Sequence, residues 1–180
     1  MIKYYSTKTY GTDRGLSCCF RQWRADHSHC SLLHGYSIGI KLVFESKTLD
    51  EKNWVFDFGG LKLFKEWADS MFDHTLIIAK DDPQLEFFKH MANLGDPFAS
   101  GTGTLDDVIE PHKRHALCDL RIVEGVGWEA FAKLCYDEMS SLLMDMKFDK
   151  SLSRYPVNID VRLKSAEVFE HAGNSAIYEG

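Results

Sequence analysis

The segment from Tyr36 to Phe44 places a large apolar side chain at every second position, with Ser37, Gly39 and Lys41 between them. Successive side chains of a strand point to opposite faces, so this period of two is typical of a strand that turns one face toward a core. The sequence therefore predicts a strand here. It also predicts that this strand forms an antiparallel hairpin with the strand-like segment 17–28 before it.

Apolar residues recur at helical spacing in two longer segments, which predicts two main amphipathic helices at about 61–72 and 128–146. Weaker patterns predict a short helix at 83–92 and strands at 2–10, 117–123, 157–163 and 166–178. The Gly, Pro, Ser and Thr content of 96–104 predicts a flexible loop. The order of these elements indicates an α+β chain built on an antiparallel sheet.

The composition limits the class of protein. The 180 residues fit one domain spanning 1–180, and 44% apolar with 27% charged residues is ordinary for a globular chain. A formal net charge of -6 argues against a nucleic-acid or membrane-surface protein. No run approaches the roughly 18 apolar residues of a membrane span, and the start has no apolar signal region. The five cysteines are odd in number and form no CxxC pair, so no disulfide framework is expected and the cytoplasm is the predicted compartment.

Metal-ligand side chains are concentrated directly before the alternating strand, where three imidazoles and one thiol fall within eight residues, His27 to His34. In an extended strand His27 and His29 would project from the same face, and a turn over 30–33 could bring His34 back toward them. Three protein ligands and one open position form the usual catalytic zinc site, so a metal site is one interpretation. The other is a polar hairpin whose histidines are solvated.

Six short motifs follow one another between about residues 17 and 178. They are Trp23-x-Ala25-x-His27, Cys30-x3-His34-Gly35-Tyr36, Val55-x-Asp57-Phe58-x-x-Leu61-Lys62, Phe72-Asp73-His74, Val126-Gly127-Trp128-Glu129, and Glu170-His171 through Tyr178. In this order they resemble the motifs of the 6-pyruvoyl-tetrahydropterin synthase and 6-carboxytetrahydropterin synthase family, the T-fold enzymes. The three-residue gap between Cys30 and His34 is similar to the 6-carboxytetrahydropterin branch.

The resemblance implies a T-fold, in which a four-stranded antiparallel sheet carries two main helices on one face. In that family the sheets of several subunits join into a β-barrel with active sites between subunits. A homo-oligomer, either a trimer or a hexamer, is therefore expected, with no nucleic-acid or membrane partner. The segment between His74 and Glu129 is longer than is usual in the family, which implies an insertion at about 80–124.

The resemblance also implies a reaction. A carbon–oxygen lyase would convert 7,8-dihydroneopterin triphosphate to 6-carboxy-5,6,7,8-tetrahydropterin with zinc, an early step toward 7-deazaguanine nucleosides such as queuosine. The zinc ligands would be His27, His29 and His34. Bound zinc would lower the pKa of the substrate's side-chain hydroxyls. The sequence does not show which Lys or Arg would contact the triphosphate, and Arg21, Arg24 and Lys164 are guesses only.

The same resemblance assigns roles to the other site residues. Cys30 would be the general base, and Asp73 would orient His74 in a second acid/base unit. Glu170 would hold the pterin by accepting two parallel N–H bonds. Glu129 is either a second substrate contact or a first-turn helix residue that the helix dipole stabilises.

One residue of the second motif departs from the family pattern. Tyr36 stands where the family has its third zinc ligand, and a neutral phenol is a poor ligand, so His29 is the expected substitute. Two alternatives follow: a 6-pyruvoyl-tetrahydropterin synthase-like or other pterin side-chain lyase, and a non-catalytic pterin- or purine-binding T-fold protein. Cys30, Asp73 and His74 argue for an enzyme, because a pure binder has no use for them.

Overall fold

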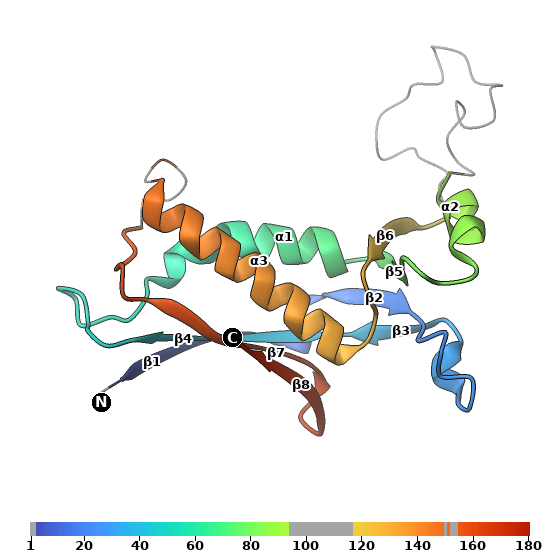
Figure 1. Ribbon diagram of the computed structural model, residues 1–180, viewed down its shortest axis with the longest axis horizontal. Helices are drawn as coiled ribbons and strands as arrows, with labels where there is room; N and C mark the ends of the chain where they lie inside the picture. Colours follow the sequence, from blue (N-terminus) through green and yellow to red (C-terminus); the bar gives the residue numbers. More distant parts are fainter. Residues whose placement is uncertain (1–2, 94–116, 150, 152–154) are drawn as a thin grey trace, which may run out of the picture. The chain divides into compact units, whose positions relative to one another are not determined.

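The computed structural model describes residues 3–93, 117–149, 151 and 155–180 (Figure 1). In chain order the elements are β1 (Tyr4–Tyr10), η1 (Thr12–Arg14), β2 (Ser17–Phe20), η2 (His29–Ser31), β3 (His34–Ser37), β4 (Gly39–Ser46), η3 (Phe58–Leu61), α1 (Lys62–Phe72), β5 (Thr75–Ala79), α2 (Leu85–Asn93), β6 (Asp119–Val123), α3 (Trp128–Phe148), β7 (Arg162–His171) and β8 (Asn174–Glu179), where η denotes a 3₁₀ helix. The predicted loop at 96–104 and the middle of the expected insertion at 80–124 lie outside the described residues.

The chain divides into two compact units. Unit 1 comprises Met1–Ser17, Tyr36–Asp73 and Gly127–Gly180, and unit 2 comprises Cys18–Gly35 and His74–Val126. Each of the two units contains most of one four-stranded sheet. None of the described helices has both the length and the apolar character that crossing a membrane requires.

The sheet of unit 1 has the strand order β1-β4-β7-β8, and every neighbouring pair in it is antiparallel. The two long helices α1 and α3 lie on one face of this sheet (Figure 1). α3 contacts β7, β8 and α1. These observations confirm the predicted α+β class, with two main helices on an antiparallel sheet.

The alternating segment supplies the core of unit 1. Its apolar residues Ile38, Ile40, Leu42 and Phe44 are fully buried. Between the helices, the rings of Phe72 and Phe131 meet edge to face, with centroids 5.6 Å apart. Complete burial of side chains of this size is worth about 1.5–3 kcal/mol each, so these contacts join the helices firmly to the sheet.

The central strands of unit 2 run parallel. β2 pairs with β5, and β5 pairs with β6, in a sheet of order β3-β2-β5-β6. Helix α2 covers this sheet through a buried cluster of Leu76, Ile78 and Phe88. All five residues of β5, TLIIA, are buried, and the four that follow Thr75 form a continuous apolar run. Central parallel strands lack the alternation by which strands are recognised, which is why the sequence did not predict β5.

The predicted hairpin of 17–28 with 36–44 is confirmed only in part. β2 ends at Phe20 and is hydrogen-bonded to β3, which contains the start of the predicted second strand, whereas β4 belongs to the other sheet. Turn bonds replace a strand ladder after Phe20, because Ala25 N donates to Gln22 O at 2.9 Å and Ser28 N donates to Ala25 O at 3.1 Å. The segment 36–44 is also divided at Ile38, whose N–H donates to Leu16 O at 2.9 Å.

The boundaries of the C-terminal strands also differ from the prediction. Instead of strands at 157–163 and 166–178, β7 runs through both segments from Arg162, and a turn at 172–173 leads to β8. Asn158 delays the start of β7, because its backbone oxygen accepts a bond from Val161 N at 3.1 Å in a local turn. The predictions of β1, α1, α2, β6 and α3 are confirmed to within a few residues.

Candidate functional site

The histidine loop, defined here as residues 21–33, connects β2 to β3. Its backbone closes on itself, because Gln22 N donates to Cys30 O at 2.8 Å. The hydroxyl of Ser28 caps η2 by accepting a hydrogen bond from Cys30 N at 3.2 Å. His29 and Cys30 therefore lie in a short 3₁₀ helix and His27 lies in a turn, so the expectation that His27 and His29 share one face of a strand is wrong.

The loop nevertheless brings two of the three imidazoles together. The ring centroids of His29 and His34 are 6.2 Å apart, and the ring planes are inclined by 57°. His34 Nδ1 lies 2.8 Å from Leu32 O, so with the proton on Nδ1 the lone pair that a metal requires is on Nε2. The side chain of His27 is 82% exposed, and its Nδ1 lies 3.9 Å from a carboxylate oxygen of Asp26.

The side chains of the histidine loop and His34 meet part of the requirements of a zinc site. Imidazole is a preferred ligand, and two imidazoles on one tetrahedral zinc have ring centroids about 5 Å apart, given bonds of about 2 Å. The 6.2 Å separation of His29 and His34 is close to this value. In the described part of the chain, however, no three His, Cys, Asp or Glu groups come close enough to hold a metal ion. The pair thus fits two ligand positions, and the third ligand is not assembled with them there.

Tyr36 makes a packing contact that the sequence did not predict. Its ring meets the ring of Trp128 edge to face, with centroids 5.2 Å apart and planes at 87°. Trp128 is the first residue of α3 and belongs to the altered motif Val126–Glu129. Aromatic pairs in this geometry are stabilising, so the phenol at the family's third ligand position packs against the start of a helix.

The cysteines fall into two groups. Burial raises the pKa of four thiols, those of Cys18 (to about 12), Cys19, Cys118 and Cys135. These four remain protonated at neutral pH and serve as small apolar groups. Cys30 is half-buried and follows His29 directly within η2. Its place beside an imidazole makes it the cysteine best suited to acid/base chemistry.

Asp73 and His74 lie just past the end of α1, as the sequence predicted. Asp73 caps the helix, because its N–H donates to Asp69 O at 2.9 Å. His74 has a φ of 56°, in the left-handed region that residues with a Cβ seldom adopt. Both side chains are exposed. Backbone strain of this kind concentrates at functional sites, so it supports a role for the pair.

The backbone at His74 gives a prediction about stability. Glycine adopts a positive φ without cost, whereas alanine does not, so His74→Ala should have a free energy of unfolding about 1 kcal/mol lower than His74→Gly. Urea denaturation of the two variants measures this difference. Both variants lack the imidazole, so the difference between them reports the backbone alone. Equal free energies of unfolding would show that the positive φ at position 74 costs nothing.

Glu170 lies at an irregularity of the β7–β8 ladder. Phe169 pairs with Ser175, but His171 pairs with Asn174, so Glu170 stands where the register shifts. Its side chain is half-buried. A bulge redirects a side chain and is frequent beside active sites, which suits the role of a ligand anchor.

Glu129 lies in the first turn of α3 and is exposed. Gly127 precedes that helix with a φ of 120°, which L side chains rarely adopt. Both readings of Glu129, as a substrate contact and as a partner of the helix dipole, agree with this place. Glu129 and Glu170 belong to unit 1, whereas Cys30 and the three histidines belong to unit 2.

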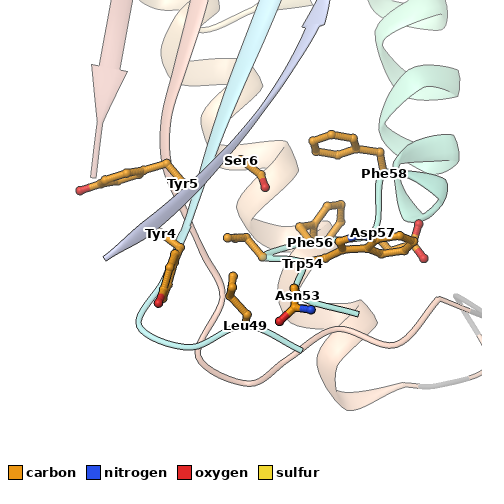
Figure 2. A pocket seen from close by; sticks show the side chains of 10 residues that line it. Tyr4, Tyr5, Ser6, Leu49, Asn53, Trp54, Phe56, Asp57 and Phe58 are labelled. Atoms are coloured by element: carbon orange, nitrogen blue, oxygen red, sulfur yellow. The ribbon is translucent and has the colours of Figure 1, made fainter. Parts of the chain in front are cut away.

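A pocket of about 460 Å³ lies in unit 1 between β1 and the segment 49–58 (Figure 2). Half of the residues that line it are aromatic: Tyr4, Tyr5, Trp54, Phe56 and Phe58. Asp57, which also lines it, caps η3 by accepting a hydrogen bond from Gly59 N at 3.0 Å. The sequence did not single out this pocket, because its two walls are about fifty residues apart in the chain.

Proteins of known sequence match part of the chain. Two curated proteins named 6-carboxy-5,6,7,8-tetrahydropterin synthase illustrate this. The one from Rickettsia conorii is 33% identical over 76 residues, which cover 37% of this chain and 55% of that protein. The one from Rickettsia typhi is 37% identical over 57 residues, covering 31% of this chain and 41% of that protein. The chain therefore spans about half the length of the curated relatives it matches.

Solved structures match the whole chain. An uncharacterized protein from Wolinella succinogenes aligns with a TM-score of 0.71 at 19% identity, covering 100% of this chain and 99% of that one. A catalytic-residue mutant of Plasmodium vivax 6-pyruvoyltetrahydropterin synthase aligns with a TM-score of 0.58 at 13% identity, with the same coverage. At these identities the likeness shows the fold alone, and it confirms the predicted T-fold.

A family model covers nearly the whole chain. The model described as 6-pyruvoyl tetrahydropterin synthase matches residues 12–180. The names of the curated matches agree with the predicted likeness to the 6-carboxytetrahydropterin branch. The chain belongs to the 6-pyruvoyl tetrahydropterin synthase family.

Proposed function

We propose that this protein is a carbon–oxygen lyase that converts 7,8-dihydroneopterin triphosphate to 6-carboxy-5,6,7,8-tetrahydropterin, a precursor of 7-deazaguanine nucleosides such as queuosine. The observation that carries the proposal is the approach of two imidazoles, His29 and His34, with the half-buried Cys30 directly after His29 in η2. The names of the Rickettsia relatives support the product.

In this proposal zinc is held by His27, His29 and His34. The approach of His29 and His34 supports two of these ligands, and the exposed ring of His27 is close to them in sequence. Bound zinc would polarise the hydroxyls of the substrate side chain.

The protein's own groups would move the protons. Cys30 would take a proton from the substrate side chain as the general base. His74 would give or take the second proton, with Asp73 fixing its tautomer. Glu170 would accept the N–H groups of the pterin edge, and Glu129 would make a second substrate contact.

We also propose that the protein is a homo-oligomer, a trimer or a hexamer with active sites between subunits. β1 and β8 are the outer strands of the described sheet of unit 1. Outer strands present backbone N–H and C=O groups to a partner, and a second copy would cover them as the sheets close into a barrel. The pocket beside β1 supports this, because Tyr5 is 50% exposed and Trp54 is 46% exposed there.

A second candidate is a 6-pyruvoyl-tetrahydropterin synthase-like reaction or another pterin side-chain lyase. The contact between Tyr36 and Trp128 favours it, because that contact changes the family's third ligand position. A changed ligand set would alter which bond of the substrate side chain breaks.

Product analysis tests the proposal. The purified protein is incubated with 7,8-dihydroneopterin triphosphate, first with zinc and then after treatment with a chelator. We expect 6-carboxy-5,6,7,8-tetrahydropterin, acetaldehyde and triphosphate, with turnover lost on chelation and restored by zinc. A 6-pyruvoyl product without acetaldehyde would favour the second candidate. Binding of the pterin without turnover would mark a non-catalytic binder.

A further inference from the structure

A buried ion pair joins the start of the histidine loop to the segment after β5. Arg21 Nε donates to Asp82 Oδ2 at 2.9 Å, and Arg21 Nη2 donates to Asp82 Oδ1 at 2.6 Å. The side chain of Asp82 is 1% exposed and that of Arg21 is 19% exposed. A bidentate guanidinium–carboxylate pair is strong and fixes direction as well as distance. The first residue of the loop is therefore held in one orientation.

Asp82 is a rigid partner for Arg21. Its backbone N donates to Ala79 O at 3.0 Å, and its backbone O accepts from Leu85 N at 3.0 Å. Its Oδ1 also accepts from Gln84 N at 2.8 Å. Burial acts to raise the pKa of Asp82, but the bonds from Arg21 and Gln84 outweigh burial and hold this pKa below its usual value. Asp82 is therefore a charged, fixed point between β5 and α2.

Hydrogen bonds connect the residue after Arg21 to the 3₁₀ helix that carries His29. Gln22, the next residue, donates from its backbone to Cys30 O at 2.8 Å and from its side chain to Val126 O at 3.0 Å. Cys30 and His29 are consecutive in η2. The fixed orientation of Arg21 therefore positions Gln22, the residue whose backbone bond to Cys30 closes the loop. All of these contacts lie within unit 2.

A second, exposed ion pair reinforces the first. Arg24 contacts Asp81 at 2.7 Å, with side chains 61% and 41% exposed. Trp23 Nε1 donates to the same carboxylate at 3.2 Å. Exposed pairs of this kind contribute little alone, so the buried pair is the main anchor.

We infer that Arg21 and Asp82 are positioning residues, which orient the histidine loop for metal binding without touching the metal. This inference rests on the proposed zinc site at His29 and His34. Neither residue is among the proposed zinc ligands.

Zinc titration of Asp82→Asn against a competing chelator tests the inference on the full-length protein. We expect the zinc Kd to rise about tenfold, as is typical when a group that orients a ligand is lost. The matched control is Glu45→Gln in unit 1, where the Glu45 side chain is 7% exposed and accepts from Arg162 at 2.6 Å. This variant also breaks a buried ion pair, but its Kd should equal that of the wild type. An unchanged Kd in Asp82→Asn overturns the inference.

The double variant Arg21→Met/Asp82→Leu tests the inference even if Asp82→Asn does not fold. Apolar pairs of similar volume often replace a buried ion pair without loss of stability. We expect this variant to unfold at the temperature of the wild type and still to bind zinc about tenfold more weakly. If the double variant binds zinc with the Kd of the wild type, buried side chains of any kind at these two positions are sufficient. The ion pair is then not needed, which overturns the inference.

Amide hydrogen exchange of the metal-free protein separates this inference from the proposed function. We expect the Gln22 N–H to exchange faster in Asp82→Asn and at the wild-type rate in Glu45→Gln, while β4 amides stay protected in both. Equal exchange at Gln22 in all three proteins overturns the positioning role. If the wild type binds no zinc, the proposed function fails, and the exchange at Gln22 still decides whether Asp82 orders the loop.

Discussion

Replacing Cys30 with alanine is expected to lower kcat for 7,8-dihydroneopterin triphosphate about a thousandfold while zinc content stays unchanged. A positioned general base contributes about 10²–10⁴-fold to a rate, and the proposal assigns that base to this thiol. The proposed zinc ligands are imidazoles, so the metal should remain. The measurements are product formation at saturating substrate and the metal content of the purified variant.

The matched control is Cys19→Ala. Cys19 is also half-buried in unit 2, but burial raises its pKa, and it packs against the cluster beneath α2. We expect kcat of this variant to equal that of the wild type. Wild-type kcat in Cys30→Ala would remove the thiol from the mechanism, and loss of zinc in that variant would make the thiol a ligand instead.

Replacing His34 with alanine is expected to abolish zinc binding under conditions that saturate the wild type. Loss of groups that only orient a ligand weakens a metal site about 10–100-fold, and loss of a ligand costs more. Zinc at a hundred times its Kd stabilises the folded protein by about 2.7 kcal/mol. The Tm of the wild type should therefore rise when zinc is added, whereas the Tm of His34→Ala should not change. Thermal unfolding with and without zinc measures this.

Two further variants define the ligand set. His90→Ala changes an exposed histidine of α2 in the same unit and should keep the zinc-dependent Tm of the wild type. His27→Ala should lose it, because His27 is proposed as the third ligand. If His27→Ala keeps the shift in Tm while His34→Ala loses it, the third ligand is a different group.

The two helices of the main layer were predictable because each carries one apolar stripe at helical spacing. The stripe of α3 contains Phe131, Cys135 and Met139, and all three are fully buried. β5 was not predictable in the same way, because it is buried on both faces and its apolar run has no period. The start of β7 likewise depends on a turn at Asn158, which competes with extension of the strand.

For the candidate site, the sequence indicated which residue types are present but not how they are arranged in space. The cluster of His27, His29 and His34 with Cys30 is visible in the sequence, but the assumption of an extended strand put the wrong pair of histidines together. Ser28 caps η2, so His29 lies in a 3₁₀ helix and not in a strand. Its ring centroid is 6.2 Å from that of His34. The contact of Tyr36 with Trp128 joins two motifs about ninety residues apart, which no local pattern indicates.

The sequence by itself determined the class of fold, the family motifs and the types of side chain available for chemistry. Those properties are local, because periodicity and residue type are set within a few residues of each position. Only the tertiary structure decided which strands pair, which two imidazoles approach each other and which aspartate holds Arg21. These depend on contacts between distant segments, such as Arg21 with Asp82, whose free energy is gained only when the chain brings both groups out of water together.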